Sequence, residues 1–114
     1  MTLDTTQNVP LELWKDGTIR VKGTRLLLDM IIHAHNRGEI PEDIADSFPA
    51  ASVADVYAII AYYLNNKKKI DRYLAKQERE AEKVRKMLES LPGYKERQHE
   101  LKNLIKKRGR ELNK

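Results

Sequence analysis

The stretch GEIPEDIADSFPAASVADVYAIIAYYL, from Gly38 to Leu64, decides the fold. Pro41 favours the first turn of a short helix over residues 41–47, because proline has a preset φ and the missing N–H needs no partner there. Pro49 ends this helix, since the residue before a proline is pushed out of the α region. The first half of the stretch therefore predicts one short helix and a turn.

The second half predicts a longer and more apolar helix. Ser52 is suited to the N-cap, and Asp55, three residues on, is suited to the reciprocal position of a capping box. Apolar residues then recur at helical spacing: Val53, Val56, Tyr57, Ile59, Ile60, Tyr63 and Leu64. A helix with so broad an apolar face is expected to be the core element of the domain.

Two helices joined by a short turn have the geometry of a DNA-binding helix-turn-helix, whose second helix enters the major groove. Between Ser52 and Leu64, however, the sequence has no Arg, Lys, Asn or Gln, the side chains that read base edges. The order of elements favours a DNA-binding fold, whereas the residue types favour a core or dimer scaffold. We expect the second role for this helix.

Residues Leu11 to Arg25 predict a β-hairpin ahead of the helices. Asp16 and Gly17 form the pair favoured in a two-residue type I′ loop, which needs positive φ at both positions. With this loop, Trp14 pairs with Ile19 across the strands.

This pairing also predicts which side chains face the helices. Trp14, Ile19 and Val21 share the inner face, because side chains alternate along a strand. Leu11 and Leu13 then point outward beside an open strand edge, which predicts a homodimer contact.

A further helix is predicted over residues 26–37, between the hairpin and the stretch already described. Thr24 is suited to its N-cap and Gly38 to its C-cap. His33 and His35 fall in this helix, but residues two apart point to different sides of a helix and cannot share a metal ion. We therefore expect no metal site.

The last fifty residues predict a charged helical tail, separate from a domain over residues 1–64. One helix is expected over residues 65–91 and another over 95–112, interrupted by Pro92 and Gly93. Their apolar stripes contain Ile70, Leu74, Ala81, Val84, Leu88 and Leu91 in the first helix, and Leu101, Leu104, Ile105 and Leu112 in the second. Such thin stripes are expected to dock into a groove of a partner protein.

Charge is divided unevenly along the chain. The net charge of +5 combines −4 over residues 1–64, from five basic and nine acidic residues, with +9 over residues 65–114, from seventeen basic and eight acidic ones. A basic tail predicts an acidic partner, either nucleic acid or an acidic protein surface. A solvated extension without a partner is the plainer alternative.

The residues that common catalytic sites require are missing. The chain has no cysteine, no glycine-rich phosphate loop and no G-x-S-x-G motif. We therefore expect a protein that is not an enzyme and needs no cofactor. No apolar run approaches the length of a membrane span, and the first residues lack a signal-peptide pattern, so the cytoplasm is the expected location.

Several motifs resemble those of the bacterial "domain of unknown function 433" family. They are IRVKGTRL (residues 19–26), GEIPEDI (38–44), Phe48-Pro49, SVADVY (52–57), AYYL (61–64) and IDRYL (70–74). The resemblance extends over about residues 11–74. It implies an antitoxin of a type II toxin–antitoxin pair, with a dimeric DNA-binding domain and a C-terminal segment that wraps a ribonuclease-like toxin of the PIN class.

Two functions stay open at this point. In the first, the tail of an antitoxin inserts an Arg or Lys into the acidic, metal-binding cleft of the toxin. In the second, a small nucleic-acid-binding protein grips phosphates with its tail and has no toxin partner.

The residues expected to carry these functions fall into two sets. Basic residues of the hairpin predict contacts with operator DNA: Arg20, Lys22 and Arg25. The expected toxin-binding residues are Ile70, Leu74, Val84, Leu88, Leu91, Arg97, Leu101, Leu104, Ile105, Arg108 and Arg110. The expected fold is mainly α: a small three-helix, helix-turn-helix-like domain with an N-terminal β-hairpin, followed by an extended helical tail.

Overall fold

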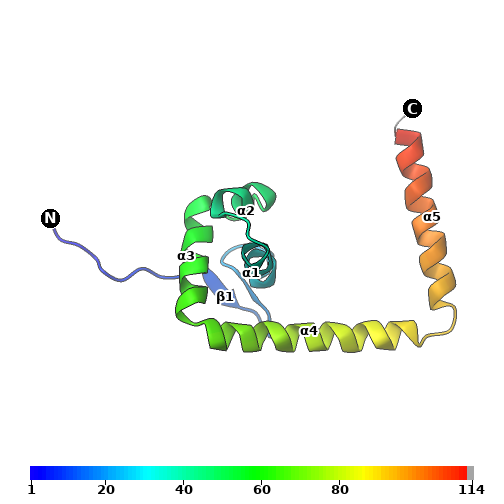
Figure 1. Cartoon of the computed structure of the whole chain (residues 1–114), viewed down its shortest axis with the longest axis horizontal. Coiled ribbons are helices and arrows are strands. Elements are labelled where there is room, and N and C mark those ends of the chain that lie inside the picture. Colours follow the sequence, from blue (N-terminus) through cyan, green and yellow to red (C-terminus); the bar gives the residue numbers. More distant parts are fainter. Residues whose placement is uncertain (113–114) are drawn as a thin grey trace. The chain divides into compact units, whose positions relative to one another are not determined.

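The chain forms a short β-hairpin followed by five α-helices (Figure 1), in a computed structural model that describes the backbone of residues 1–112 and the side chains of residues 1–104. The strands are β1 (Leu11–Leu13) and β2 (Ile19–Val21). The helices are α1 (Leu28–Asn36), α2 (Pro41–Ser47), α3 (Val53–Asn65), α4 (Lys67–Glu89) and α5 (Tyr94–Leu112). The expected mainly helical fold with an N-terminal hairpin is confirmed.

The chain divides into two compact units, Met1–Ala75 and Lys76–Lys114. The division falls inside α4 and not after Leu64, where the sequence analysis placed it. The reason is that Ile70 and Leu74, on the first two turns of α4, are only 4% and 9% exposed in the core of the first unit. These turns belong to the folded domain and not to the tail.

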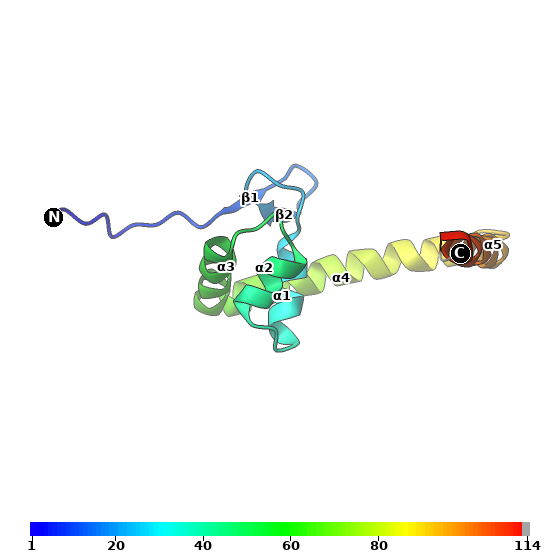
Figure 2. The ribbon, with the colours of Figure 1, turned by 90° about the horizontal axis from the view of Figure 1, so that it is seen from above.

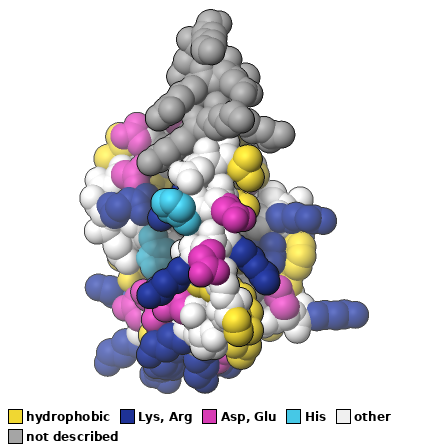
Figure 3. Space-filling model, turned by 90° about the vertical axis from the view of Figure 1, so that its right-hand side faces the viewer, with side chains coloured by type: hydrophobic (Ala, Val, Ile, Leu, Met, Phe, Trp, Pro, Cys, Tyr) yellow, Lys and Arg dark blue, Asp and Glu magenta, His cyan; other side chains and the backbone are white. Residues whose placement is uncertain are grey.

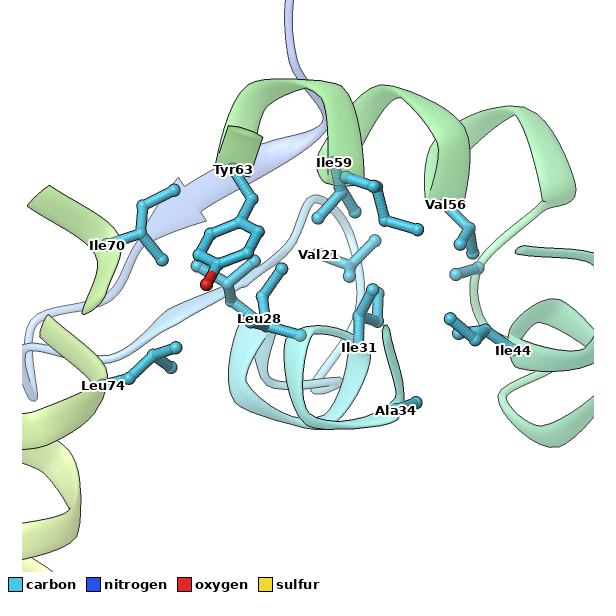
Figure 4. Packing of buried hydrophobic residues seen from close by; sticks show 13 residues of the cluster. Val21, Leu28, Ile31, Ala34, Ile44, Val56, Ile59, Tyr63, Ile70 and Leu74 are labelled. Atoms are coloured by element: carbon cyan, nitrogen blue, oxygen red, sulfur yellow. The ribbon is translucent and has the colours of Figure 1, made fainter. Parts of the chain in front are cut away.

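The core of the first unit lies between α1, α3, β2 and the start of α4 (Figure 4). Its members are Val21, Leu28, Ile31, Ile32, Ala34, Ile44, Ala51, Val56, Ile59, Ile60, Tyr63, Ile70 and Leu74. Tyr63 is the largest fully buried side chain, and its hydroxyl donates a hydrogen bond to Oδ1 of Asp71 at 2.7 Å, which raises the pKa of Tyr63. The prediction that α3 is a core element is confirmed.

The hairpin has a different register from the one expected. Leu11 pairs with Val21 and Leu13 with Ile19. The connection has three residues, because the Trp14 N–H donates to the carbonyl of Thr18 at 2.8 Å and Gly17, at φ +85°, is its left-handed residue. No described residue other than glycine has a positive φ, so the type I′ loop, which needs one at Asp16, is wrong.

This one-residue shift reverses the faces of β1, since side chains alternate with a period of two. Leu11 packs against the core beside Val21, and the prediction that it points outward is wrong. Trp14 lies against Arg20 instead of covering the helices, with the Arg20 guanidinium carbon 4.0 Å from the centre of the indole ring. Leu13 alone of the two leucines is exposed. Figure 2 shows the hairpin beside α1, α2 and α3.

Helix α1 begins later than expected, at Leu28, and Thr24 does not cap it. The Thr24 hydroxyl donates to the carbonyl of Val21 at 2.9 Å and accepts from the Leu26 N–H at 3.0 Å. Thr24 therefore closes the turn after β2. Leu27, the N-cap position, forms a bridge with Arg20 and extends the hairpin by one pairing.

The expected end of α1 at Gly38 and the expected start of α3 at Ser52 are confirmed, whereas α4 spans Lys67–Glu89 and not 65–91, and α5 begins at Tyr94 and not at Lys95. Gly38, at φ +92°, follows α1, and the N–H of Glu39 reaches back to the carbonyl of Ala34 at 3.2 Å, as in a Schellman motif. The Ser52 hydroxyl accepts from the Asp55 N–H at 3.1 Å and caps α3. Local backbone chemistry therefore determines these termini.

Candidate partner-binding site

The second unit is built around the corner between α4 and α5. After α4 ends at Glu89, the Ser90 hydroxyl donates to the carbonyl of Met87 at 2.6 Å. Gly93, at φ +77°, then turns the chain into α5, and the Tyr94 N–H donates to the carbonyl of Leu91 at 3.2 Å. The expected interruption at Pro92 and Gly93 is confirmed.

An apolar hollow of about 440 Å³ lies at this corner. Its lining residues are Leu88, Leu91, Pro92, Tyr94, Arg97, Gln98 and Leu101. The three leucines are exposed, as are Val84, Met87 and Leu104 nearby in the sequence. Among the side chains described between residues 76 and 104, none is buried, so this unit has no core of its own there.

Polar groups border the hollow on the side of α5. The Gln98 side-chain amide donates to the Tyr94 hydroxyl oxygen at 2.9 Å, which leaves the tyrosine proton available to another acceptor. Arg97 makes no ion pair with a described residue. A guanidinium beside exposed leucines can bind a carboxylate through two parallel hydrogen bonds.

Positive charge predominates in the second unit. Residues 76–114 contain thirteen Lys and Arg residues against seven Asp and Glu, a net charge of +6, while residues 1–75 have a net charge of −1. On α4, Lys83 lies 3.8 Å from Glu80 and Arg85 lies 2.6 Å from Glu82. Such exposed pairs add little stability. Figure 3 shows isolated hydrophobic side chains among many charged ones.

The structure brings part of the expected toxin-binding set together. Leu88, Leu91, Arg97 and Leu101 line the hollow, while Val84 and Leu104 are exposed outside its lining. Ile70 and Leu74 are core residues of the first unit, which corrects their assignment to a binding stripe. The side chains of Ile105, Arg108 and Arg110 lie outside the described residues.

Sequence reasoning missed three lining residues: Pro92, Tyr94 and Gln98. A signal for two of them was present. Tyr94, Gln98 and Leu101 have the spacing i, i+4 and i+7, which places them on one face of a helix. That face becomes visible in the sequence once the helix is started at Tyr94 rather than at Lys95.

The three residues expected to contact DNA differ in availability. Arg20 is held inside the hairpin: its Nη1 donates to the carbonyl of Arg25 at 3.1 Å and its Nε donates to the Thr18 hydroxyl at 3.1 Å. Its Nη2 lies 3.4 Å from Asp16, whose pKa is lowered by hydrogen bonds from Thr18 and by the charge of Arg20. Lys22 and Arg25 are exposed and carry the accessible charge of this face.

The two histidines of α1 lie in different surroundings. His33 is exposed, and the ring of His35 packs edge-on against Tyr63 with centroids 6.1 Å apart. Within the described part of the chain, no three acidic, cysteine or histidine side chains converge on a possible metal position. No helix among the described residues combines the length and apolarity that a membrane crossing requires.

Residues 15–63 match the model of a family described as "Protein of unknown function (DUF433)". Neither a curated protein nor a solved structure matches the chain. The matched region contains β2, α1, α2 and most of α3, all within the first unit, and the second unit lies outside it. Residues 15–63 are therefore a domain of the DUF433 family.

Proposed function

We propose that this protein is the antitoxin of a type II toxin–antitoxin pair and that its second unit neutralises a PIN-like ribonuclease. The observation that carries the proposal is the apolar hollow at the α4–α5 corner, in a unit with no buried side chain among its described residues. Exposed leucines without a core are typical of a segment that buries them against a partner. The resemblance of the first unit to an antitoxin-associated family supports the same function.

The mechanism follows from the residues of the hollow. Leu88, Leu91 and Leu101 supply the apolar contact with a groove of the toxin, and the guanidinium of Arg97 reaches the carboxylates of its acidic cleft. An arginine that binds those carboxylates competes with the divalent cation that a PIN-like ribonuclease needs. The net charge of +6 favours approach to an acidic cleft.

The test is neutralisation of a ribonuclease encoded beside this protein. Leu88→Ala combined with Leu101→Ala should weaken inhibition of RNA cleavage by about 100-fold, because anchoring side chains supply most interface energy. Met87→Ala is the matched control, since Met87 is exposed on α4 but does not line the hollow. Equal inhibition by both variants would contradict this mechanism.

Nucleic-acid binding is the second candidate function, either to operator DNA or as the sole activity. It is favoured by the exposed positions of Lys22 and Arg25 in the segment that follows β2. Replacing both with Ala should reduce the slope of log affinity against log salt by about two units, roughly one for each phosphate contact. Tight, salt-sensitive binding to arbitrary DNA without a toxin partner would favour a nucleic-acid-binding protein over an antitoxin.

A further inference from the structure

Helix α3 has an apolar outer face in addition to its buried one. Val53, Tyr57 and Leu64 are 42%, 49% and 57% exposed, and Ala54 and Ala61 are exposed between them. Their spacing places these residues along one side of the helix. No charged residue occurs in the sequence between Asp55 and Lys67. Helix α3 has the place in the chain of a DNA-recognition helix, but its exposed side is apolar.

Helix α2 packs against α3 and adds one exposed apolar residue of its own. The Tyr57 hydroxyl donates a hydrogen bond to Glu42, which fixes the ring beside α2, and Ile40 at the α2 N-cap is 55% exposed. Contiguous exposed apolar patches of a few hundred Å² on a monomer are often functional. A stable dimer buries about 800 Å² on each partner, so flanking residues must contribute to such an interface.

The two ends of α3 carry opposite charges. Asp55 lies in its first turn, and Glu42 of α2 accepts a hydrogen bond from Tyr57 in its second turn. Asp43 and Asp46 are further exposed carboxylates of the same short helix α2. After the last residue of α3 come three lysines, Lys67, Lys68 and Lys69, in the first turn of α4. None of these seven groups makes an ion pair with a described residue. Lysines in a first turn also oppose the helix dipole, so the stability of α4 does not explain them.

We propose that the outer face of α3 binds the same face of a second copy of this chain, with the two helices antiparallel about a twofold axis. In this arrangement the acidic end of each α3 meets the lysines that follow the other, and the apolar residues meet between them. A parallel arrangement would instead place like charges together. In such a twofold dimer the same surface of each copy buries the apolar residues of α3 and pairs the acidic groups of one copy with the lysines of the other.

The dimer also accounts for the residue types of α3. The helix has no base-reading side chain because its outer face is covered by a second copy and does not enter DNA. The expected homodimer contact at Leu11 and Leu13 is replaced by this surface, since Leu11 packs against the core.

The first test is the mass of the full chain in sedimentation equilibrium at about 50 µM, a range in which interfaces of standard size associate. The wild type should be a dimer, and Leu64→Glu should raise its dissociation constant at least about tenfold by burying a charge. Leu101→Glu on α5 is the matched control, because Leu101 is similarly exposed at 63% and lies outside α3. A monomeric wild type, or a dimer weakened by Leu101→Glu and not by Leu64→Glu, would overturn the proposal.

The second test determines the orientation by reversing charges. One variant carries Lys67→Glu and Lys68→Glu, and the other carries Asp43→Lys and Asp46→Lys, all at exposed positions. Each variant alone should have a dissociation constant at least about tenfold higher, since like charges meet at both ends. Mixing the two should restore a heterodimer of wild-type affinity. Failure of the mixture to associate would overturn the antiparallel arrangement.

Discussion

At the scale of single residues, Arg20 shows how packing removes a charge from the accessible surface. Its guanidinium stacks on Trp14 and donates to Thr18 and to the carbonyl of Arg25. The face of the guanidinium, its Nε and its Nη1 are therefore all engaged by neighbouring groups of the same domain. In the sequence, Arg20 looks equivalent to Lys22 and Arg25, but in the structure its side chain has a structural role.

Replacing Arg20 tests this structural role. Arg20→Ala should lower the free energy of unfolding by about 1–2 kcal/mol, because it removes a cation–π contact and several hydrogen bonds. Arg20→Lys should recover only part of this, since an ammonium lacks the planar fork. Urea denaturation measures the effect, with Arg25→Ala as the control near zero. If both alanine variants are equally stable, Arg20 is not structural.

Asp29, on the first turn of α1, predicts a dependence of stability on pH. Burial raises the pKa of Asp29, and its buried Oδ1 has no hydrogen-bond partner among the described residues. The folded state therefore holds the proton more tightly than the unfolded state, so ionised Asp29 is destabilising at pH 7 and this cost disappears as pH falls through its raised pKa. Asp29→Asn should add less than about 1 kcal/mol at pH 7, since the group is partly exposed and solvent-screened.

Thermal unfolding of Asp29→Asn between pH 7 and pH 4 checks this prediction. The advantage of the variant should shrink as the pH is lowered. An advantage that grows on acidification would show that the ionised carboxylate stabilises the start of α1, as expected from the helix dipole alone.

At the scale of elements, α4 is one continuous helix that belongs to both units, because the division falls after Ala75. Its first two turns place Ile70 and Leu74 in the core, and the Tyr73 hydroxyl accepts a hydrogen bond from the Ile19 N–H at 2.7 Å. Beyond Ala75 the described residues of the helix have no buried side chain. Apolar residues recur at helical spacing on both sides of Ala75, but only those before it are covered by other elements of the domain.

Truncating one leucine in each part of α4 distinguishes them. Leu74→Ala should lower the free energy of unfolding by about 2–4 kcal/mol, because it leaves a cavity in the core. Leu88→Ala should change it by less than about 0.5 kcal/mol, as is usual for an exposed residue. Trp14, the one tryptophan of the chain, lies in the first unit and reports its unfolding by fluorescence. Equal effects of the two substitutions would contradict the division after Ala75.

At the scale of the whole molecule, a domain with a core is joined to a basic unit without described buried side chains. The first unit has a net charge of −1 and thirteen buried hydrophobic residues, and the second has a net charge of +6. Folding free energy therefore comes mainly from the first unit, whereas the second presents binding surface.

Shortening the chain after Leu91 separates these contributions. The shortened protein lacks α5 and five of the seven residues that line the hollow, so we expect it to lose neutralisation of the ribonuclease completely. Its unfolding midpoint, measured by Trp14 fluorescence, should stay within about 2 °C of the full chain, because the core is untouched. Full neutralisation by the shortened chain would show that residues 92–114 are a solvated extension.

The sequence by itself determined the features that depend on neighbouring residues. Pro41 and Ser52 start helices, and Gly38 ends one, because each acts on backbone groups within a few residues of itself. The leucines and the arginine of the hollow are likewise predictable, since they lie close together along the chain on either side of Pro92 and Gly93.

The tertiary structure decided the features that depend on distant contacts. The hairpin register differs by one residue from the predicted one, and in the observed register Leu11 packs against the core. Because side chains alternate along a strand, this shift places the opposite face of β1 toward the core. Ile70 and Leu74 became core residues because the first turns of α4 pack on elements distant in the sequence. A stripe of apolar residues specifies that a helix has something to bury, but only the packing of the whole chain decides whether its own domain or another molecule covers it.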